Sequence, residues 1–206
     1  MGLVKRNPNE SSSVGKPRRP SCKKLQAGLE NADPAVRRRS AQDLVHCPNA
    51  VEALSSQLKR EEEVAVREAI LETLAKLKQP SAVNELVACL RSEDAALRNE
   101  AIETLKHISF DLSETIKILL SDPDADVRIF AINILESRCE PDVESWLIDV
   151  IERDENLNVC ATAADLLCEV GTEAAVDPLM RLKNRFASDA YIQFASDLAL
   201  KRIRET

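Results

Sequence analysis

The sequence predicts an all-α protein, a right-handed α-solenoid (superhelix) of about six helical hairpins. A unit of about 31 residues recurs six times, and such a period is typical of hairpins that bury their apolar faces only against neighbouring hairpins. The steps between one aligned position in successive copies are 30, 31, 30, 32 and 32 residues. The composition also favours helix, because aromatic residues make up 3% of the chain and glycine occurs only 4 times. The aligned position, called position zero, is occupied by Arg37, Arg67, Arg98, Arg128, Cys160 and Ile192.

The chain divides into a short N-terminal segment and a repeat region. Residues 1–21 contain Pro8, Pro17, Pro20 and three successive serines but no apolar period, so this segment has too little apolar surface to offset the entropy of ordering. Residues 1–24 hold seven Lys or Arg against one Glu, a net charge of +6. We therefore expect residues 1–21 to be a disordered basic tail and residues 22–206 to form the solenoid.

Each repeat is expected to contain a first helix, a short acidic turn and a second helix. Residues 81–111 show this order, with Ser81 predicted to cap the first helix and Ser92-Glu93-Asp94 forming the turn. The next repeat is expected to open with a capping box in residues 111–114, Asp-Leu-Ser-Glu. Helix-breaking residues fall between the units, where a helix must stop. They are Pro48, Pro80, Pro141 and Gly171.

The second helices share one inward stripe at positions −1, +3, +4 and +7 from position zero. Position +3 is mostly alanine and position +7 is leucine in five of the six repeats, which predicts close helix approach and a filled core. Position zero lies at the edge of the stripe, where a guanidinium needs a partner. The acids of the turns are the expected partners, namely Asp33, Glu62 or Glu63, Asp94, and Asp122 or Asp124.

One part of the repeat region carries a family resemblance. Residues 74–83 read Leu-Ala-Lys-Leu-Lys-Gln-Pro-Ser-Ala-Val, and residues 90–105 read Leu-Arg-Ser-Glu-Asp-Ala-Ala-Leu-Arg-Asn-Glu-Ala-Ile-Glu-Thr-Leu. This pattern resembles HEAT repeats of the short type first described in phycobilisome lyases, over about residues 22–206. The family includes lyase subunits, scaffolds, adaptors and a few enzymes, so the resemblance predicts the fold more sharply than the function.

The resemblance also implies a role for position zero. In that family the turn acid and the arginine form a ladder between successive repeats, which gives the four arginines at position zero a structural role. Because Cys160 and Ile192 replace arginine, the ladder is expected to fail in the last two repeats. The implied structural ladder is Arg37, Arg67, Arg98 and Arg128.

Charge and cysteine content narrow the functional classes. The net charge is −7, but residues 25–206 alone carry −13, which argues against binding of a phosphate backbone by the repeats. The six cysteines form no Cys-x-x-Cys pair, so we expect neither a disulfide framework nor a zinc site, but mostly small apolar fillers in a reducing compartment. No apolar run approaches the roughly 20 residues of a membrane span, and the start lacks a secretory signal. We therefore predict a cytoplasmic protein.

The sequence offers no convergent set of catalytic groups. His46 and His107 are the only histidines and lie in different repeats, and neither is followed by Glu as in the iron-dependent hydroxylases built on HEAT repeats. A Gly-rich phosphate loop and a Ser or Cys nucleophile motif are also absent. We predict no enzymatic activity, no metal site and no cofactor.

The candidate binding site lies on the outward side of the late second helices. Positions +2 and +5 point away from the inward stripe, toward the concave side that second helices line in an α-solenoid. Position +2 becomes Phe130 in the fourth repeat and Phe194 in the sixth. An exposed apolar surface of this extent usually marks a contact site. The predicted partner-binding residues are Ile129, Phe130, Asn133, Thr162, Asp165, Phe194 and Asp197.

Burial is the alternative explanation for this apolar surface. For Ile134, Leu166 and Leu198 at position +6 we expect burial, because this flank of the helix is half covered by its neighbours. For Phe130 and Phe194 we expect exposure. The acidic residues around them predict a partner with an apolar centre and a basic rim.

The predicted function is a non-enzymatic scaffold or adaptor that binds a protein partner on its concave surface, in signalling or complex assembly. The alternative implied by the resemblance is a phycobilin lyase-like subunit, or a chaperone for the chromophore or its apoprotein, although acidic late repeats fit anionic propionates poorly. Phosphate-backbone binding, as in HEAT-like DNA glycosylases, is disfavoured by the charge of the repeats. A patch at Arg38 and Arg39, with the basic tail, either holds an acidic partner or keeps the first repeat solvated.

Overall fold

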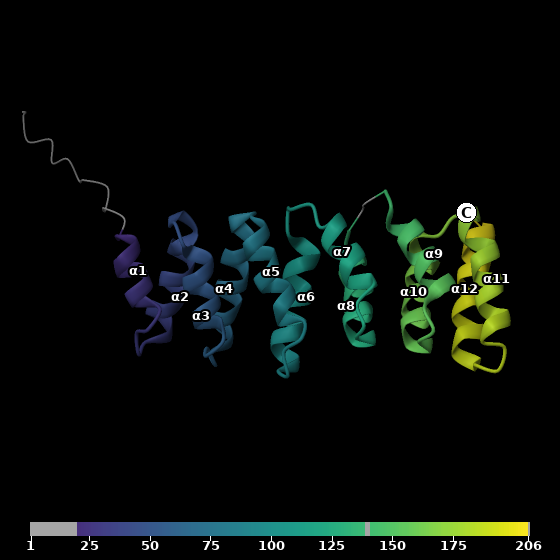
Figure 1. Cartoon of the computed structure of the whole chain (residues 1–206), viewed down its shortest axis with the longest axis horizontal. Coiled ribbons are helices and arrows are strands. Elements are labelled where there is room, and N and C mark those ends of the chain that lie inside the picture. The colour runs from purple at the N-terminus through teal and green to yellow at the C-terminus, as the bar shows by residue number, and fades with distance from the viewer. Residues whose placement is uncertain (1–19, 139–140, 206) are drawn as a thin grey trace, which may run out of the picture.

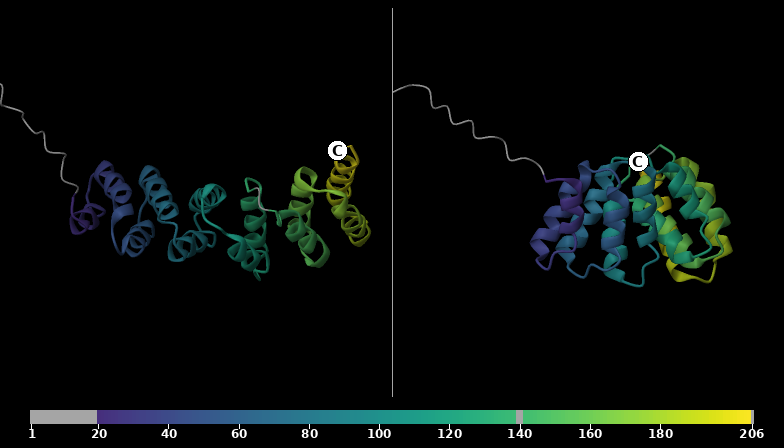
Figure 2. Two further views of the ribbon diagram at one scale, coloured as in Figure 1. Left: turned by 90° about the horizontal axis from the view of Figure 1, so that it is seen from above. Right: turned by 60° about the vertical axis from the view of Figure 1, so that its left-hand side comes forward.

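The structure is a computed structural model that describes residues 20–138 and 141–205, and within these ranges the chain is all-α. Its helices form six hairpins that follow one another in a row, so that α1 and α12 lie at opposite ends of the molecule (Figure 1). Two further views show the same row (Figure 2). The predicted α-solenoid of about six helical hairpins is confirmed. Most of the predicted tail falls on residues 1–19, which lie outside the described residues.

Each hairpin pairs a first helix with a second helix. The first helices are α1 (Cys22–Gly28), α3 (Ala50–Leu58), α5 (Pro80–Cys89), α7 (Ser113–Leu120), α9 (Val143–Arg153) and α11 (Val176–Arg185). The second helices are α2 (Pro34–Asp43), α4 (Val64–Leu77), α6 (Ala95–His107), α8 (Ala125–Leu135), α10 (Leu157–Val170) and α12 (Ala190–Glu205). Two short 3-10 helices, η1 (Leu44–His46) and η2 (Glu173–Ala175), precede α3 and α11.

Side chains in the turns begin four of the second helices. Asp33, Asp94, Asp124 and Asn156 each accept a hydrogen bond from the backbone N–H two residues further on, at 2.8 to 2.9 Å. Each bond satisfies one of the N–H groups that a helix start leaves without an intrahelical acceptor. The turn acids therefore fix the point at which the chain reverses into the second helix.

The first helices begin differently from the prediction. Helix α5 starts at Pro80, so Ser81 lies inside its first turn and does not cap it; proline at this position already has the φ angle and the missing N–H that suit a helix start. Before α7, the Asp111 carboxylate accepts a bond from the Ser113 N–H at 2.9 Å. Glu114 pairs with a lysine one turn further on instead of reaching back, so the predicted capping box does not form.

The core lies along the predicted stripe of the second helices. Position +3 is buried in every repeat, and so is position +7. Val36, at position −1 of the first repeat, is 39% exposed, so the predicted burial of the stripe does not hold at this residue. Full burial of one leucine side chain contributes about 2 kcal/mol, so a column of them is a main source of stability. The buried +7 residues are Leu44, Leu74, Leu105, Leu135, Leu167 and Ala199.

One cysteine pair contradicts the sequence-based expectation. Cys22, the first residue of α1, forms a disulfide with Cys47, which follows η1. The prediction of no disulfide was wrong here, because the fold brings these two residues to a Cα–Cα distance of 5.7 Å although 25 positions separate them in the chain. Cys89 and Cys160 are free and buried, as expected of apolar fillers, and burial raises the pKa of the Cys89 thiol to about 11.

Candidate functional site

The second helices together form one continuous face of the solenoid, here called the inner face. Successive second helices contact one another along the row, from α2 to α12. Position +5 is exposed in five repeats and half-buried in the fourth, whereas position +2 varies from exposed Arg39 and Phe194 to buried Ala69, so +2 does not point outward in every repeat as predicted. Position zero lies at the edge of the face, near the turns. The edge carries the position-zero residues and the inner face carries the outward residues. The residue types at both change from the first repeat to the last.

At the edge, arginine at position zero links successive repeats. The Arg67 guanidinium donates to both Glu100 carboxylate oxygens, at 2.9 and 3.2 Å, and to Asp94 at 3.2 Å. Arg128 binds both oxygens of Asp154 at 2.6 and 2.9 Å. These bidentate pairs span one repeat to the next and lie mostly out of solvent, which strengthens them relative to surface pairs.

Arg37 has the same kind of contact with an acid that the sequence did not single out. Its guanidinium binds both oxygens of Glu61, at 2.8 and 2.9 Å, rather than Glu62 or Glu63. The hydrogen bond from Arg37 lowers the pKa of Glu61, against the effect of burial, and a bond from Gln57 adds to this lowering. The nearly buried Glu61 carboxylate therefore stays ionised.

Arg98 departs from this arrangement. Its guanidinium donates to the carbonyl oxygens of Ser92 and Glu93 in its own turn, at 2.6 and 3.2 Å. The expected acid, Asp122, is paired instead with Arg91 in the turn that follows α5, and this bond lowers the pKa of Asp122. Arg98 also lies 6.0 Å from the centre of the Phe130 ring, within the range of a cation–π contact.

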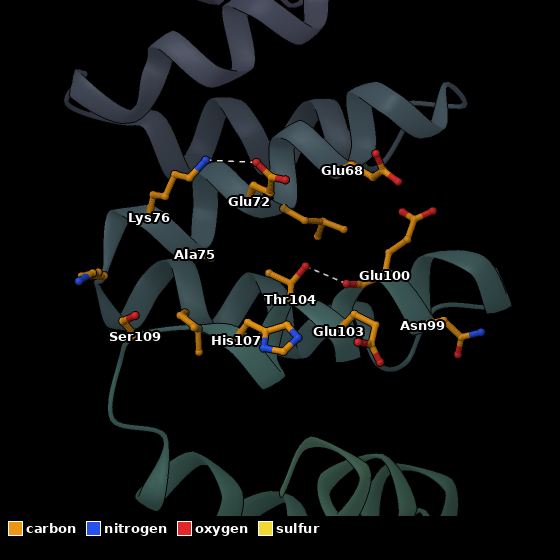
Figure 3. Close-up of a pocket in the computed structure, with 13 residues that line it drawn as sticks. Glu68, Glu72, Ala75, Lys76, Asn99, Glu100, Glu103, Thr104, His107 and Ser109 are labelled. Carbon is orange, nitrogen blue, oxygen red and sulfur yellow. Dashed lines mark hydrogen bonds and ion pairs between the residues drawn. The ribbon is translucent and has the colours of Figure 1, made fainter. Parts of the chain in front are cut away.

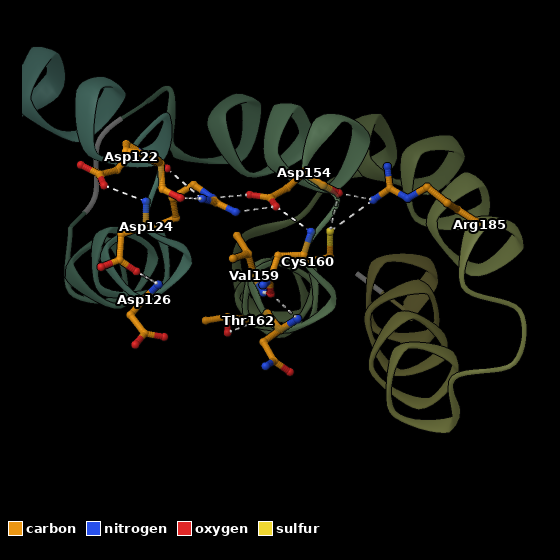
Figure 4. Close-up of polar contacts among 12 residues, drawn as sticks. Asp122, Asp124, Asp126, Asp154, Val159, Cys160, Thr162 and Arg185 are labelled. Carbon is orange, nitrogen blue, oxygen red and sulfur yellow. Dashed lines mark hydrogen bonds and ion pairs between the residues drawn. The ribbon is translucent and has the colours of Figure 1, made fainter.

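The fifth repeat has Cys160 at position zero, and another residue supplies a guanidinium there (Figure 4). Arg185, the last residue of α11, donates to the carbonyl oxygens of Ile151, Glu152 and Asp154 at 2.8 to 3.0 Å. Its guanidinium also lies 3.2 Å from the Cys160 sulfur. Burial raises the pKa of Cys160 more than Arg185 lowers it, so the thiol stays protonated and is not a nucleophile. Sequence reasoning missed Arg185 because it lies outside the repeat register.

The predicted partner-binding residues fall into two groups on the inner face. Ile129, Phe130 and Asn133 lie on α8, where all three are half-buried. Phe194 on α12 is 64% exposed, in agreement with the expected exposure. Helix α10 separates the two groups, so the structure does not bring the two phenylalanines together. The remaining predicted residues, half-buried Thr162 and exposed Asp165 and Asp197, lie on α10 and α12.

The flanking residues at position +6 behave in two ways. Ile134 and Leu166 are buried, as expected, whereas Leu198 is 46% exposed and the expectation of burial was wrong. Leu198 follows Tyr191 and Phe194 at helical spacing, so all three lie on one outward stripe of α12. Tyr191 is 52% exposed although it occupies position −1 of the predicted inward stripe, so the expected burial was wrong at this residue. We call Tyr191, Phe194 and Leu198 the α12 ridge.

Acidic side chains border the α12 ridge. The Tyr191 hydroxyl donates to the Asp165 carboxylate across the α10–α12 interface at 2.6 Å, which raises the pKa of Tyr191. On the other side of the ridge, Asp197 pairs with Lys183 of α11. The ridge is therefore an apolar strip with a fixed anionic border, on a helix that packs closely against α10.

A groove of about 770 Å³ between α4 and α6 was not predicted (Figure 3). Its apolar lining includes Leu71, Ala75 and Ile108. Sequence reasoning missed it because the search for a site followed aromatic residues at outward positions. The available signal was acidic: position +5 is glutamate in two successive repeats, Glu72 and Glu103. The charged residues that line the groove are Glu68, Glu72, Glu100, Glu103, Lys76 and Lys78, with His107 near them.

Two kinds of feature do not occur in the described ranges, 20–138 and 141–205. No group of three or more His, Cys, Asp or Glu side chains there has a geometry suited to a metal ion. No helix in these ranges combines the length and the apolar character that crossing a bilayer requires. The two histidines, His46 on η1 and His107 at the end of α6, belong to separate hairpins.

Comparison with known proteins agrees with the repeat architecture. The family model described as HEAT repeats matches residues 22–106 and 112–200, which confirms the resemblance seen in the sequence. An uncharacterized phycocyanin operon protein Z of Pseudanabaena tenuis (strain PCC 7409) is 25% identical over 152 residues, which cover 69% of this chain and 75% of that protein.

Solved structures with related repeats include the complex of CpcE and CpcF of phycocyanin lyase from Nostoc sp. PCC7120. It is 19% identical, with a TM-score of 0.37, over 98% of this chain and 100% of that chain. The condensin Cnd3–Cnd2 subcomplex of S. pombe is 20% identical, with a TM-score of 0.45, over 89% of this chain and 27% of that chain.

Proposed function

The chain belongs to the HEAT-repeat family, and we propose that it is a non-enzymatic adaptor that binds a protein partner on the inner, concave face of its late repeats. The observation that carries this proposal is the α12 ridge, in which the most exposed side chain, Phe194, is 64% exposed. Aromatic side chains exposed beside other apolar groups are costly in water and are enriched at contact sites. The partner's role in signalling or complex assembly and the cytoplasmic location stay predictions.

The border of the α12 ridge suggests the chemistry of the partner. Asp165 and Asp197 flank the ridge and are exposed, so a segment with an apolar centre and basic residues around it is the best complement. Because α12 packs closely on α10, the ridge has little freedom to rearrange on binding. A preformed surface of this kind keeps the entropic cost of association low.

The test is capture of partners with a ridge variant. Phe194→Asp places a charge in the centre of the ridge without disturbing the core, so it should abolish capture of the proteins that the wild-type chain retains from a native lysate. Far-UV circular dichroism should not change, because Phe194 projects into solvent. The matched control is Ile118→Asp on the first helix α7, where Ile118 is 71% exposed but lies away from the inner face.

Two outcomes would contradict the proposal. If Phe194→Asp and Ile118→Asp retain the same proteins as the wild-type chain, the α12 ridge is not the contact surface. If Phe194→Asp lowers the helical signal, the Phe194 ring is part of the core, and the variant loses binding because it unfolds. Phe130→Asp is a less direct test, since Phe130 is half-buried and lies near Arg98.

A second candidate function rests on the name of one relative, the phycocyanin operon protein Z. This second candidate is a phycobilin lyase-like subunit or chaperone. It would hold a linear tetrapyrrole, or the apoprotein that receives it, during attachment or removal. The acidic border of the α12 ridge fits propionate groups poorly. Titration of the purified chain with phycocyanobilin distinguishes the two candidates: the adaptor proposal expects no change in the bilin absorption spectrum, and a saturable shift would favour the second candidate.

A further inference from the structure

We propose that residues 1–19 of this chain bind in the groove between α4 and α6. This inference is independent of the α12 ridge, because the groove lies in the second and third hairpins and the ridge lies in the sixth. It assigns an occupant to the groove and a role to the basic segment. Three properties support it: the chemistry of the groove, the complementary charge of the segment, and the length of chain available.

The groove combines an apolar floor with an anionic wall. Leu71, Ala75 and Ile108 line the groove. Glutamates from both helices also line it (Figure 3). Four glutamates and two lysines line the groove, and one of these glutamates, Glu100, is already paired with Arg67. Such a surface binds a segment that offers cationic groups together with apolar side chains.

Three of the four groove glutamates, Glu68, Glu72 and Glu103, are exposed and available to a further cation, whereas Glu100 is held by Arg67. Glu72 pairs with Lys76 at 3.1 Å, but both side chains are 60% exposed, so this pair contributes little and exchanges readily. Glu103 is 61% exposed and shares its cation, Lys106, with Glu136 of the next repeat. An incoming ammonium or guanidinium group can therefore bind without breaking any buried contact.

Residues 1–19 supply the complementary chemistry. They contain five Lys or Arg and one Glu, a net charge of +4, and the cationic residues occur in two groups. Leu3 and Val4 directly precede the first group, so apolar and basic side chains are adjacent there. The five cationic residues are Lys5, Arg6, Lys16, Arg18 and Arg19.

The segment is long enough to reach the groove. An extended chain of 19 residues spans about 60 Å. The groove begins one hairpin beyond the one that contains α1, and packed helices are about 10 Å apart, so it is about 20 Å along the row. The nearer second helix, α2, presents exposed Arg38 and Arg39 and repels a basic segment. Charge therefore favours the α4–α6 groove over the closer surface.

The test uses the full chain and a carbodiimide, which joins a lysine amine to a carboxylate that it contacts by forming an amide with loss of water. We expect cross-links from Lys5 or Lys16 to the exposed groove glutamates Glu68, Glu72 and Glu103, identified by mass spectrometry after proteolysis. They should weaken strongly in 0.5 M salt, because the contact depends on charge. Cross-links spread equally over the acids of α8 to α12, or none to the groove, would overturn the proposal.

A pair of charge reversals separates the groove from general electrostatic attraction. Glu103→Arg should lower the yield of cross-links to Glu68 and Glu72 about fivefold, the factor expected for a lost surface ion pair. Glu114→Arg on α7 makes the same change in net charge at a side chain that is 86% exposed and outside the groove, and should leave the yield unchanged. Equal effects of the two variants would contradict the proposal. Circular dichroism confirms that both variants fold.

An isotope experiment distinguishes the chain's own segment from that of a second copy. Equal amounts of unlabelled and ¹⁵N-labelled chain are mixed at low micromolar concentration and cross-linked. Binding within one chain gives only cross-links in which both peptides carry the same label. Mixed-label cross-links would assign the groove to a neighbouring molecule and would overturn the proposal as stated.

Discussion

The early repeats (α1 to α6) and the late repeats (α7 to α12) share one backbone arrangement but present different inner faces. In the early repeats, glutamates line a groove, and a bidentate pair at Arg67 ties successive hairpins together at the edge. In the late repeats the α12 ridge is apolar, and the guanidinium at the Cys160 position comes from Arg185 of the following hairpin. The same fold thus carries two surfaces of different chemistry.

The difference shows which positions the fold constrains. Positions +3 and +7 are buried in all six repeats and vary little in character. Positions +2 and +5 vary more, from Glu100 and Glu103 in the third repeat to Phe194 and Asp197 in the sixth, although Glu100 also holds the edge contact with Arg67. Stability depends on the first set, and we attribute recognition to the second.

The largest expected effect is at the edge of the early repeats. Arg67→Ala removes the cation from Glu100 and Asp94 and leaves the Glu100 carboxylate, which is only 17% exposed, without its partner. We expect a loss of about 3 kcal/mol in the free energy of unfolding, measured by urea titration. Arg39→Ala, which breaks an exposed pair, should cost less than about 0.5 kcal/mol. Equal costs would mean that the edge contacts do not hold the repeats together.

The disulfide offers the second test, because it joins elements of the first hairpin alone. Replacing both Cys22 and Cys47 by serine frees a loop of 25 residues and should lower stability by about 3 kcal/mol on a chain-entropy estimate. In a solenoid this loss stays local. Hydrogen exchange should therefore rise in α1 to α3 and stay unchanged in α10 to α12. A uniform rise would show that the two halves unfold as one unit.

A smaller effect is expected at Arg185. Arg185→Ala leaves carbonyl groups of the α9 end without their donor and should cost about 1.5 kcal/mol. Adding Cys160→Arg to this variant restores an arginine at position zero, as in the early repeats, and should recover most of the loss. Thermal unfolding of the single and double variants measures both steps. A double variant less stable than Arg185→Ala would show that the fifth repeat cannot accommodate an arginine at position zero.

The smallest effect concerns pH. The pKa of Glu61 is lowered in the folded chain by Arg37, so the unfolded chain takes up the proton first as the pH falls. The stabilisation is complete above the ordinary value of 4.5 and is lost as the pH drops through the lower, folded value. Glu61→Gln should therefore flatten the fall in stability below pH 4.5, followed by urea unfolding from pH 6 to pH 3. An unchanged slope would mean that Glu61 contributes nothing to acid sensitivity.

The sequence predicts the repeats well because their signal is local and periodic. Leu74 and Leu105 recur at the same register, and this spacing alone assigns them to the core. Arg185 and the Cys22–Cys47 pair were missed because they depend on contacts between segments that share no register.

The candidate site was predicted only in part. Phe130 has the same position in its repeat as Phe194, yet it is half-buried near Arg98, because a following repeat and the edge cation surround it. Leu198 is exposed although its counterparts Ile134 and Leu166 are buried. Burial at a flank position depends on the neighbouring helix, and the sequence of one helix does not contain that information.

Photo-cross-linking from position 194 shows whether the α12 ridge contacts a protein partner. Benzoylphenylalanine replaces Phe194 in the full chain, which keeps an aromatic group on the α12 ridge, and cells are irradiated. The account predicts a discrete protein adduct from position 194 and none from the same amino acid at position 118 on α7. No adduct from position 194, or the same adducts from both positions, would contradict it.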